Sequence, residues 1–127
     1  MPRATQLTIS LKSKTGVLAE LARMLAEARV NITSLSAESV AGRGKIRVIV
    51  NDAVKAKRAL RRGKYRFSEE PAFVVRLRNK PGSLARVAGK LAKARVNIKA
   101  AYATTAGRGA AVVITVGSVA KARKVLR

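Results

Sequence analysis

The chain has 127 residues, of which 48% are hydrophobic and only 3% aromatic, so a packed core is expected to be built from aliphatic side chains. It contains no cysteine and no histidine, which excludes disulfides, thiolate metal sites and the commonest general base of enzymes. Twenty-eight Lys and Arg residues against six acids give a net charge of +22, and this excess predicts a polyanionic partner.

The sequence predicts a soluble, cytoplasmic protein without enzymatic activity. No apolar run approaches the roughly 18–20 residues that cross a bilayer, and the N-terminus lacks the apolar core of a secretory signal. Among the six acids only Glu69 and Glu70 are neighbours, and neither a Walker loop nor a dinucleotide fingerprint occurs. We therefore expect no catalytic residue, no cofactor, no metal and no association with a membrane.

The first half of the chain predicts the order strand, helix, strand, strand, helix, strand. Leu7, Ile9 and Leu11 alternate with polar residues, which is the period of a half-buried strand. Apolar residues at helical spacing follow Gly16 and predict an amphipathic helix. The remaining elements are predicted, in chain order, as strand 32–39, turn 42–44, strand 46–50, helix 53–62 and strand 65–67.

The second half repeats this pattern after a shift of 66 residues. Leu11–Ile32 then aligns with Leu77–Ile98, and 13 of the 22 positions are identical. We expect two domains, residues 1–70 and 71–127, joined by a linker at Glu69-Glu70-Pro71. The second copy is expected to lack its last strand, because the chain ends after its second helix, and its first strand would then be an open edge.

The two copies together resemble a known family. The order βαββαβ is that of the ferredoxin-like fold, in the α+β class. In the second copy, Asn79-Lys80-Pro81-Gly82-Ser83-Leu84 leads into an amphipathic helix that is followed by Val96-Asn97-Ile98, and this pattern resembles an ACT domain. It is most similar to the regulatory ACT module of phosphoglycerate dehydrogenases, although the first copy carries Ser13-Lys14-Thr15-Gly16 in place of Asn-x-Pro-Gly. The resemblance implies tandem ACT repeats that pair within the chain or as a homodimer.

The resemblance also implies a binding site for a free amino acid at an interface between ACT units. Loop amides at a helix N-terminus would accept the carboxylate, and an Asn amide bonds either end of a zwitterion. The same residues also have a structural interpretation, as turn glycines, helix caps and residues that tolerate positive φ, and no acidic side chain lies near these loops in the sequence. The implied contacts are Ser13, Gly16, Val17 and Asn31 in the first copy, and Asn79, Gly82, Ser83 and Asn97 in the second.

The basic residues favour a different function. Glu20 and Glu27 in the first helix of copy one are replaced by Arg86 and Lys93 in copy two. Basic residues are also predicted at hairpin tips (Arg43 and Arg108), on one face of the sheet (Arg76 and Arg78) and along a helix, a distribution that suits phosphate backbones. The predicted phosphate contacts are Arg43, Lys45, Arg47, Lys55, Lys57, Arg58, Arg61, Arg62, Lys64, Arg66, Arg76, Arg78, Arg86, Lys90, Lys93, Arg108, Lys121, Arg123, Lys124 and Arg127.

Charge and resemblance therefore lead to two hypotheses. The first is a non-catalytic RNA-binding module that associates with the ribosome or another structured RNA through phosphate contacts, since each neutralised phosphate releases counterions. The alternative is a regulatory ACT module that senses a small amino acid. The charge is spread over both copies: residues 1–66 carry 15 basic and four acidic side chains, and residues 67–127 carry 13 and two.

Overall fold

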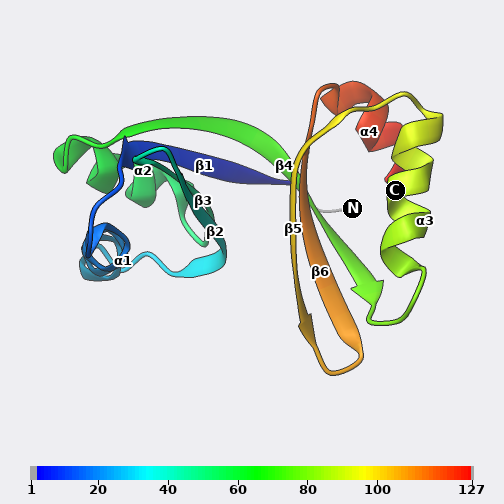
Figure 1. Cartoon of the computed structure of the whole chain (residues 1–127), viewed down its shortest axis with the longest axis horizontal. Helices are drawn as coiled ribbons and strands as arrows, with labels where there is room; N and C mark the ends of the chain where they lie inside the picture. Colours follow the sequence, from blue (N-terminus) through cyan, green and yellow to red (C-terminus); the bar gives the residue numbers. More distant parts are fainter. Residues whose placement is uncertain (1–2, 127) are drawn as a thin grey trace. The chain divides into compact units, whose positions relative to one another are not determined.

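The computed structural model describes residues 3–126, apart from the side chain of Ala106, and shows two repeats of strand, helix, strand, strand and helix (Figure 1). The strand order is β2-β3-β1-β4-β6-β5. This confirms the predicted α+β class and the ferredoxin-like order of the repeats. The elements are β1 (Arg3–Lys12), α1 (Val17–Glu27), β2 (Ile32–Val40), β3 (Arg43–Val50), α2 (Ala53–Arg62), β4 (Arg66–Arg78), α3 (Ser83–Lys93), β5 (Ile98–Ala106), β6 (Gly109–Val116) and α4 (Val119–Val125).

The first compact unit is Thr5–Glu70. Its strand β3 pairs antiparallel with both β1 and β2, and Leu7 lies opposite Val48 in the register with β1. Alternate residues of these strands form a core with Leu21 and Leu25 of α1 and Leu60 of α2, all of which are almost completely buried. Both helices therefore cover the same face of the sheet, because the period-2 strands and the apolar helix stripes bury one side each.

The second compact unit consists of Pro71–Leu126 together with Arg3 and Ala4. Strand β6 pairs antiparallel with β4 and β5, and Phe73 lies opposite Ile114. Helices α3 and α4 lie on one face of these strands (Figure 1), and their buried residues Leu91 and Ala122 complete a separate aliphatic core around Phe73. Each repeat thus has its own core.

The expected junction at Glu69-Glu70-Pro71 coincides with the division between the two compact units, but these residues lie inside the continuous strand β4 and do not form a loop. A residue that precedes proline favours an extended backbone, so this tripeptide suits a strand as well as a linker. Strand β4 pairs with β6 only from Phe73 onward, and the missing N–H of Pro71 is not required there. The strand order has β4 between β1 and β6, and the open edge expected for the first strand of the second copy stays a prediction.

The turn between β2 and β3 was predicted one residue too late. The pairing of Val40 with Arg43 leaves Ala41 and Gly42 as a two-residue turn, with φ of 52° and 78°. Both values are positive, as the tight turn that matches the twist of a hairpin requires. Arg43 is therefore the first residue of β3 and not the hairpin tip. In the second repeat the turn is Gly107-Arg108, so Arg108 does lie at the tip.

Candidate functional site

The loops that follow the first strand of each repeat are hydrogen-bonded to the turn of the neighbouring hairpin. In the first repeat, the N–H of Ser13 donates to the carbonyl of Gly42 at 2.9 Å. In the second, the N–H of Asn79 donates to the carbonyl of Arg108 at 2.7 Å, and its Nδ2 donates to the carbonyl of Gly107 at 3.1 Å. The Asn79 amide therefore has a structural role through Nδ2.

The helices that follow these loops begin without a side-chain cap. Gly16 and Gly82 occupy the N-cap positions of α1 and α3 with φ of 85° and 89°, and no capping side chain accepts a hydrogen bond from the first amides of either helix. By contrast, Asp52 caps α2 and Ser118 caps α4 through their side-chain oxygens. The first amides of an uncapped helix, together with the positive end of its dipole, form a site suited to an anion.

Asn31 and Asn97 lie at the opposite end of their repeats. The N–H of Asn31 donates to Oδ1 of Asn51 at 2.9 Å, and the carbonyl of Asn97 accepts from the N–H of Gly117, also at 2.9 Å. The nine residues of β5 separate Asn97 from the turn that holds Asn79, a distance of about 30 Å at ~3.3 Å per residue. One repeat therefore does not bring its two groups of predicted amino-acid contacts together.

The left-handed residue after these helices is an arginine and not the expected asparagine. Arg29 and Arg95 have φ of 61° and 57°. In the first repeat the N–H of Val30 donates to the carbonyl of Leu25, and the N–H of Arg29 donates to that of Ala26. These two bonds define a Schellman motif, in which the residue directly after the C-cap takes the positive φ and the asparagine lies two residues further on.

Carboxylates that could hold an α-ammonium group are engaged elsewhere or lie in the other half of the chain. All six acids precede Pro71, so the sequence from 71 to 127 contains none. Glu20 accepts a hydrogen bond from the Tyr65 hydroxyl at 3.2 Å, and burial, with the charge of Glu20, raises the pKa of that hydroxyl. The ion pairs of the first repeat include Arg23–Glu27, Arg47–Glu38 and Lys57–Glu69.

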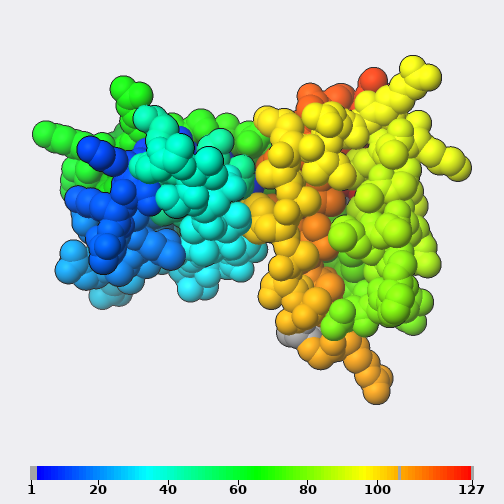
Figure 2. Space-filling model, in the orientation of Figure 1, coloured from blue at the N-terminus to red at the C-terminus, as the bar shows by residue number. Residues whose placement is uncertain are grey.

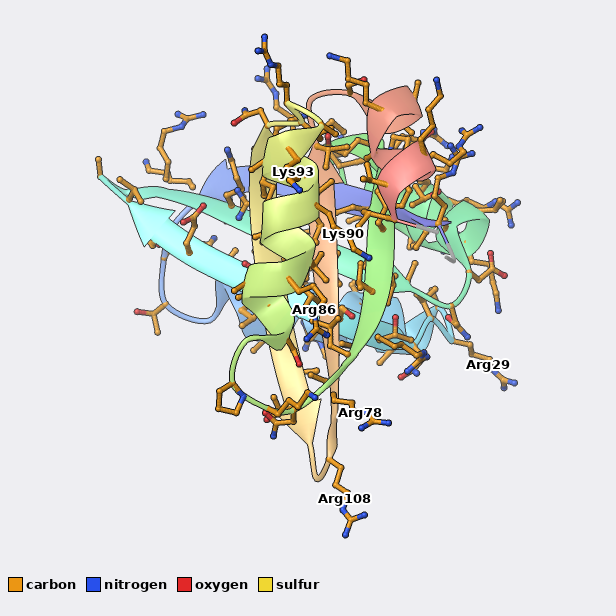
Figure 3. The ribbon with its side chains drawn as sticks, turned by 90° about the vertical axis from the view of Figure 1, so that its right-hand side faces the viewer. Arg29, Arg78, Arg86, Lys90, Lys93 and Arg108 are labelled. Carbon is orange, nitrogen blue, oxygen red and sulfur yellow. The ribbon has the colours of Figure 1, made fainter. Side chains whose placement is uncertain are left out.

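The predicted phosphate contacts are distributed over both compact units. Arg47 and Lys57 are half-buried and paired with glutamates, and Arg61 lies 5.6 Å from the centroid of the Phe67 ring. Figure 3 shows Arg86, Lys90 and Lys93 along α3, and Arg108 at the tip of a hairpin that projects from its unit in Figure 2. Arg127 lies outside the described residues. The other predicted contacts are exposed: Arg43, Lys45, Lys55, Arg58, Arg62, Lys64, Arg66, Arg76, Arg78, Lys121, Arg123 and Lys124.

Comparisons with known proteins assign the family. The sequence profile of a family described as "ACT domain pair" matches residues 3–127. The chain belongs to the ACT domain pair family. Its tandem ACT repeats, inferred from the Asn-x-Pro-Gly and Asn-Ile landmarks, are thereby confirmed. Among curated protein sequences none matches this ACT pair.

Solved structures share the fold of the ACT pair over nearly its whole length. Protein BT0572 from Bacteroides thetaiotaomicron has 33% sequence identity and a TM-score of 0.92, with 98% of this chain and 86% of that chain covered. The ligand-free regulatory subunit of aspartate kinase from Thermus thermophilus has 19% identity and a TM-score of 0.71, covering 98% and 88%. The regulatory subunit of aspartate kinase from Thermus flavus has 16% identity and a TM-score of 0.68, covering 98% and 90%.

These comparisons favour the second hypothesis from the sequence over the first. They contain nothing that supports RNA or the ribosome as a partner, so RNA binding stays a prediction based on charge alone. No cluster of potential metal ligands occurs among residues 3–126 of the ACT pair. Within the part of the chain that the structure describes, no helix has the length and apolar character needed to cross a membrane.

Proposed function

We propose that this ACT domain pair is a non-catalytic regulatory module that binds a free amino acid. The observation that carries the proposal is the uncapped helix N-terminus behind a left-handed glycine, which occurs in both repeats at Gly16 and Gly82. The N–H groups of Val17 and Ser83 donate to the carbonyls of Lys14 and Lys80 at 3.3 Å, so the amides of the next residues in α1 and α3 are the ones that suit a carboxylate. Support also comes from the family and from the fold shared with subunits that are named as regulatory.

The α-ammonium group of the ligand would be held by amide oxygens and not by a carboxylate. Asn97 is exposed, and only its backbone carbonyl is used in the bond to Gly117, which leaves the side-chain amide for a ligand. Asn31 is its counterpart in the first repeat. Because α3 has 11 residues and is about 16 Å long at ~1.5 Å per residue, its N-terminus and Asn97 lie at opposite ends of the helix, and each repeat supplies half of the contacts. A complete pocket therefore draws on two ACT units, from this chain or from a second copy.

A thermal-shift screen of the twenty L-amino acids tests this proposal. At a concentration of about 100 times Kd, a ligand that binds only the folded state adds ~2.7 kcal/mol to the free energy of unfolding, so the correct amino acid is expected to raise Tm by several degrees. For a chiral amino acid, the D-enantiomer serves as the control. If none of the twenty raises Tm at millimolar concentration, the proposal is refuted.

Variants then locate the site. Asn97→Ala removes an exposed side-chain amide while the backbone carbonyl that accepts from Gly117 is retained, so it is expected to abolish the shift and leave the Tm of the ligand-free protein nearly unchanged. Thr104→Ala is the matched control, because Thr104 is exposed on β5 away from the proposed contacts. Equal shifts in the two variants would contradict the assigned role of Asn97.

A further inference from the structure

The second repeat contains a groove of about 410 Å³ between β4, α3 and the end of α4. Its lining includes the half-buried or buried aliphatic residues Leu77, Val75 and Val87, and also Leu126. Five cationic residues line it as well, and no acidic residue does: Arg76, Arg78, Lys80, Arg86 and Lys90. In Figure 3 the side chains of Arg86 and Lys90 leave α3 on the side that faces β4. The groove thus combines an aliphatic surface with a cationic rim.

The first repeat fills the equivalent position with its own side chains. The 66-residue shift places Glu20 at the position of Arg86 and Met24 at that of Lys90. The Tyr65 hydroxyl donates to Glu20 at 3.2 Å, and Met24, Tyr65 and Phe67 pack against the aliphatic core. In the second repeat these two positions instead carry positive charges that line an open groove.

No carboxylate side chain of the second repeat is able to neutralise this groove, because the sequence from 71 to 127 contains neither Asp nor Glu. Ser83, the first residue of α3, also lines the groove, and α3 has no side-chain cap, so the positive end of its dipole adds to the same field. Five cations of like sign repel one another in the free protein. A bound anion with more than one negative charge would remove that repulsion.

The chemistry of the lining selects among anions. A zwitterionic amino acid suits the groove poorly, because no acidic side chain among the described lining residues accepts its ammonium group. A phosphate group places two negative charges and three acceptor oxygens on one centre, which matches the guanidinium fork of Arg86 and the ammonium of Lys90. The aliphatic lining favours a ligand with an apolar body, and the volume falls in the lower part of the range of about 300–1,000 Å³ typical of small-molecule sites.

We propose that the groove of the second repeat binds a small organic phosphate, with the phosphate on Arg86 and Lys90 and the apolar body against Val75 and Val87. The groove meets the proposed amino-acid site at Ser83, the first residue of α3, whereas Asn79, Gly82 and Asn97 do not line it. The phosphate proposal depends on Arg86 and Lys90, which are not among the proposed amino-acid contacts. A failure of the amino-acid screen leaves this proposal unaffected.

Isothermal titration with three probes tests the proposal. Phenyl phosphate carries both the dianion and the apolar body, inorganic phosphate carries only the dianion, and benzoate carries the body with a single charge. Phenyl phosphate is expected to bind about tenfold more tightly than either of the other two, because only this probe engages both the cationic rim and the aliphatic lining. Absence of phenyl phosphate binding, or equal affinity for phenyl phosphate and inorganic phosphate, overturns the proposal.

Variants that restore residues of the first repeat locate the site. Arg86→Glu is expected to weaken phenyl phosphate binding by about tenfold or more, the effect of losing one charge-assisted hydrogen bond, and Lys90→Met is expected to act in the same direction. Lys93→Glu is the matched control, because Lys93 also lies on α3 and has Glu27 as its counterpart, but it does not line the groove. The affinity of the Lys93→Glu variant for phenyl phosphate is expected to fall by no more than about twofold, because salt screens charges that lie outside the groove.

The same variants separate a built site from a diffuse charged surface. Equal losses of phenyl phosphate binding in Arg86→Glu and Lys93→Glu would mean that only the overall charge attracts anions, and the proposal would fail. It would also fail if a fluorescent oligouridylate bound while phenyl phosphate did not, since the basic surface would then be a nucleic-acid interface. Thermal unfolding of each variant verifies that binding is measured on folded protein.

Discussion

Replacement of Arg86 by Glu is expected to stabilise the ligand-free protein. Arg86 is exposed in the first turn of α3, four residues before Lys90, and that turn contains no acidic residue. The substitution converts a repulsive i,i+4 pair into an attractive one with Glu on the N-terminal side, a change of about 0.4–1 kcal/mol. A negative charge near the N-terminus of a helix adds about 0.3–1 kcal/mol. With allowance for exposure and salt, we expect about 1 kcal/mol in the free energy of unfolding.

Urea denaturation at low and high salt measures this effect, which corresponds to roughly 3–5 °C in Tm for a chain of this length. Arg86→Gln should give about half of the gain, because it removes the repulsion without adding the attraction. Glu20→Arg in the first repeat should destabilise by about 1 kcal/mol or more, since it also removes the acceptor of the Tyr65 hydroxyl. A loss of stability in Arg86→Glu, or a gain that does not shrink in high salt, would refute the reasoning.

Three further substitutions test the backbone and the core by urea unfolding. Gly82→Ala should destabilise the protein by about 1–2 kcal/mol, because alanine is strained at φ 89°. Gly89→Ala should stabilise it by ~0.8–1 kcal/mol, because Gly89 lies inside α3 with open space around the new Cβ. Equal effects of the two substitutions would contradict the strain argument. Arg95→Gly should stabilise by about 1 kcal/mol, because glycine adopts the observed φ of 57° without strain; a large loss would mean that the Arg95 side chain makes a stabilising contact. Leu91→Ala should lower the free energy of unfolding by about 2–5 kcal/mol, because Leu91 is fully buried. Leu84 is 55% exposed, so Leu84→Ala should change the free energy of unfolding by less than ~0.5 kcal/mol. Similar losses in the two variants would mean that the core lies elsewhere.

The local pattern of the sequence was sufficient to predict most elements. The alternation of Leu7, Ile9 and Leu11 and the helical spacing after Gly16 predicted β1 and α1, because burial on one face imposes a period on the residues themselves. The internal repeat then carried the same prediction to the second half. The family landmarks led to the ACT assignment, which the profile match over residues 3–127 confirms.

Pairing between strands overrode the local signals at specific places. Glu69-Glu70-Pro71 has the composition of a linker, yet it lies within β4. The Gly-Arg-Gly of residues 42–44 has the composition of a turn, but the register of β2 with β3 places the turn at Ala41-Gly42. Such choices depend on hydrogen bonds to residues that are distant in the sequence, and a local pattern contains no information about them.

The sequence by itself determined the charge and the duplication. The net charge is +22, no acid follows Glu70, and Glu20 of the first copy corresponds to Arg86 of the second. Only the tertiary structure decided that these charges line a groove. Arg76 and Arg86 belong to different elements, and they line one groove because α3 packs over β4. The tertiary structure also separates Asn79 from Asn97 by the length of β5. A sequence records which side chains are present, whereas a binding site requires their positions, and these follow from how the strands pair and the helices pack.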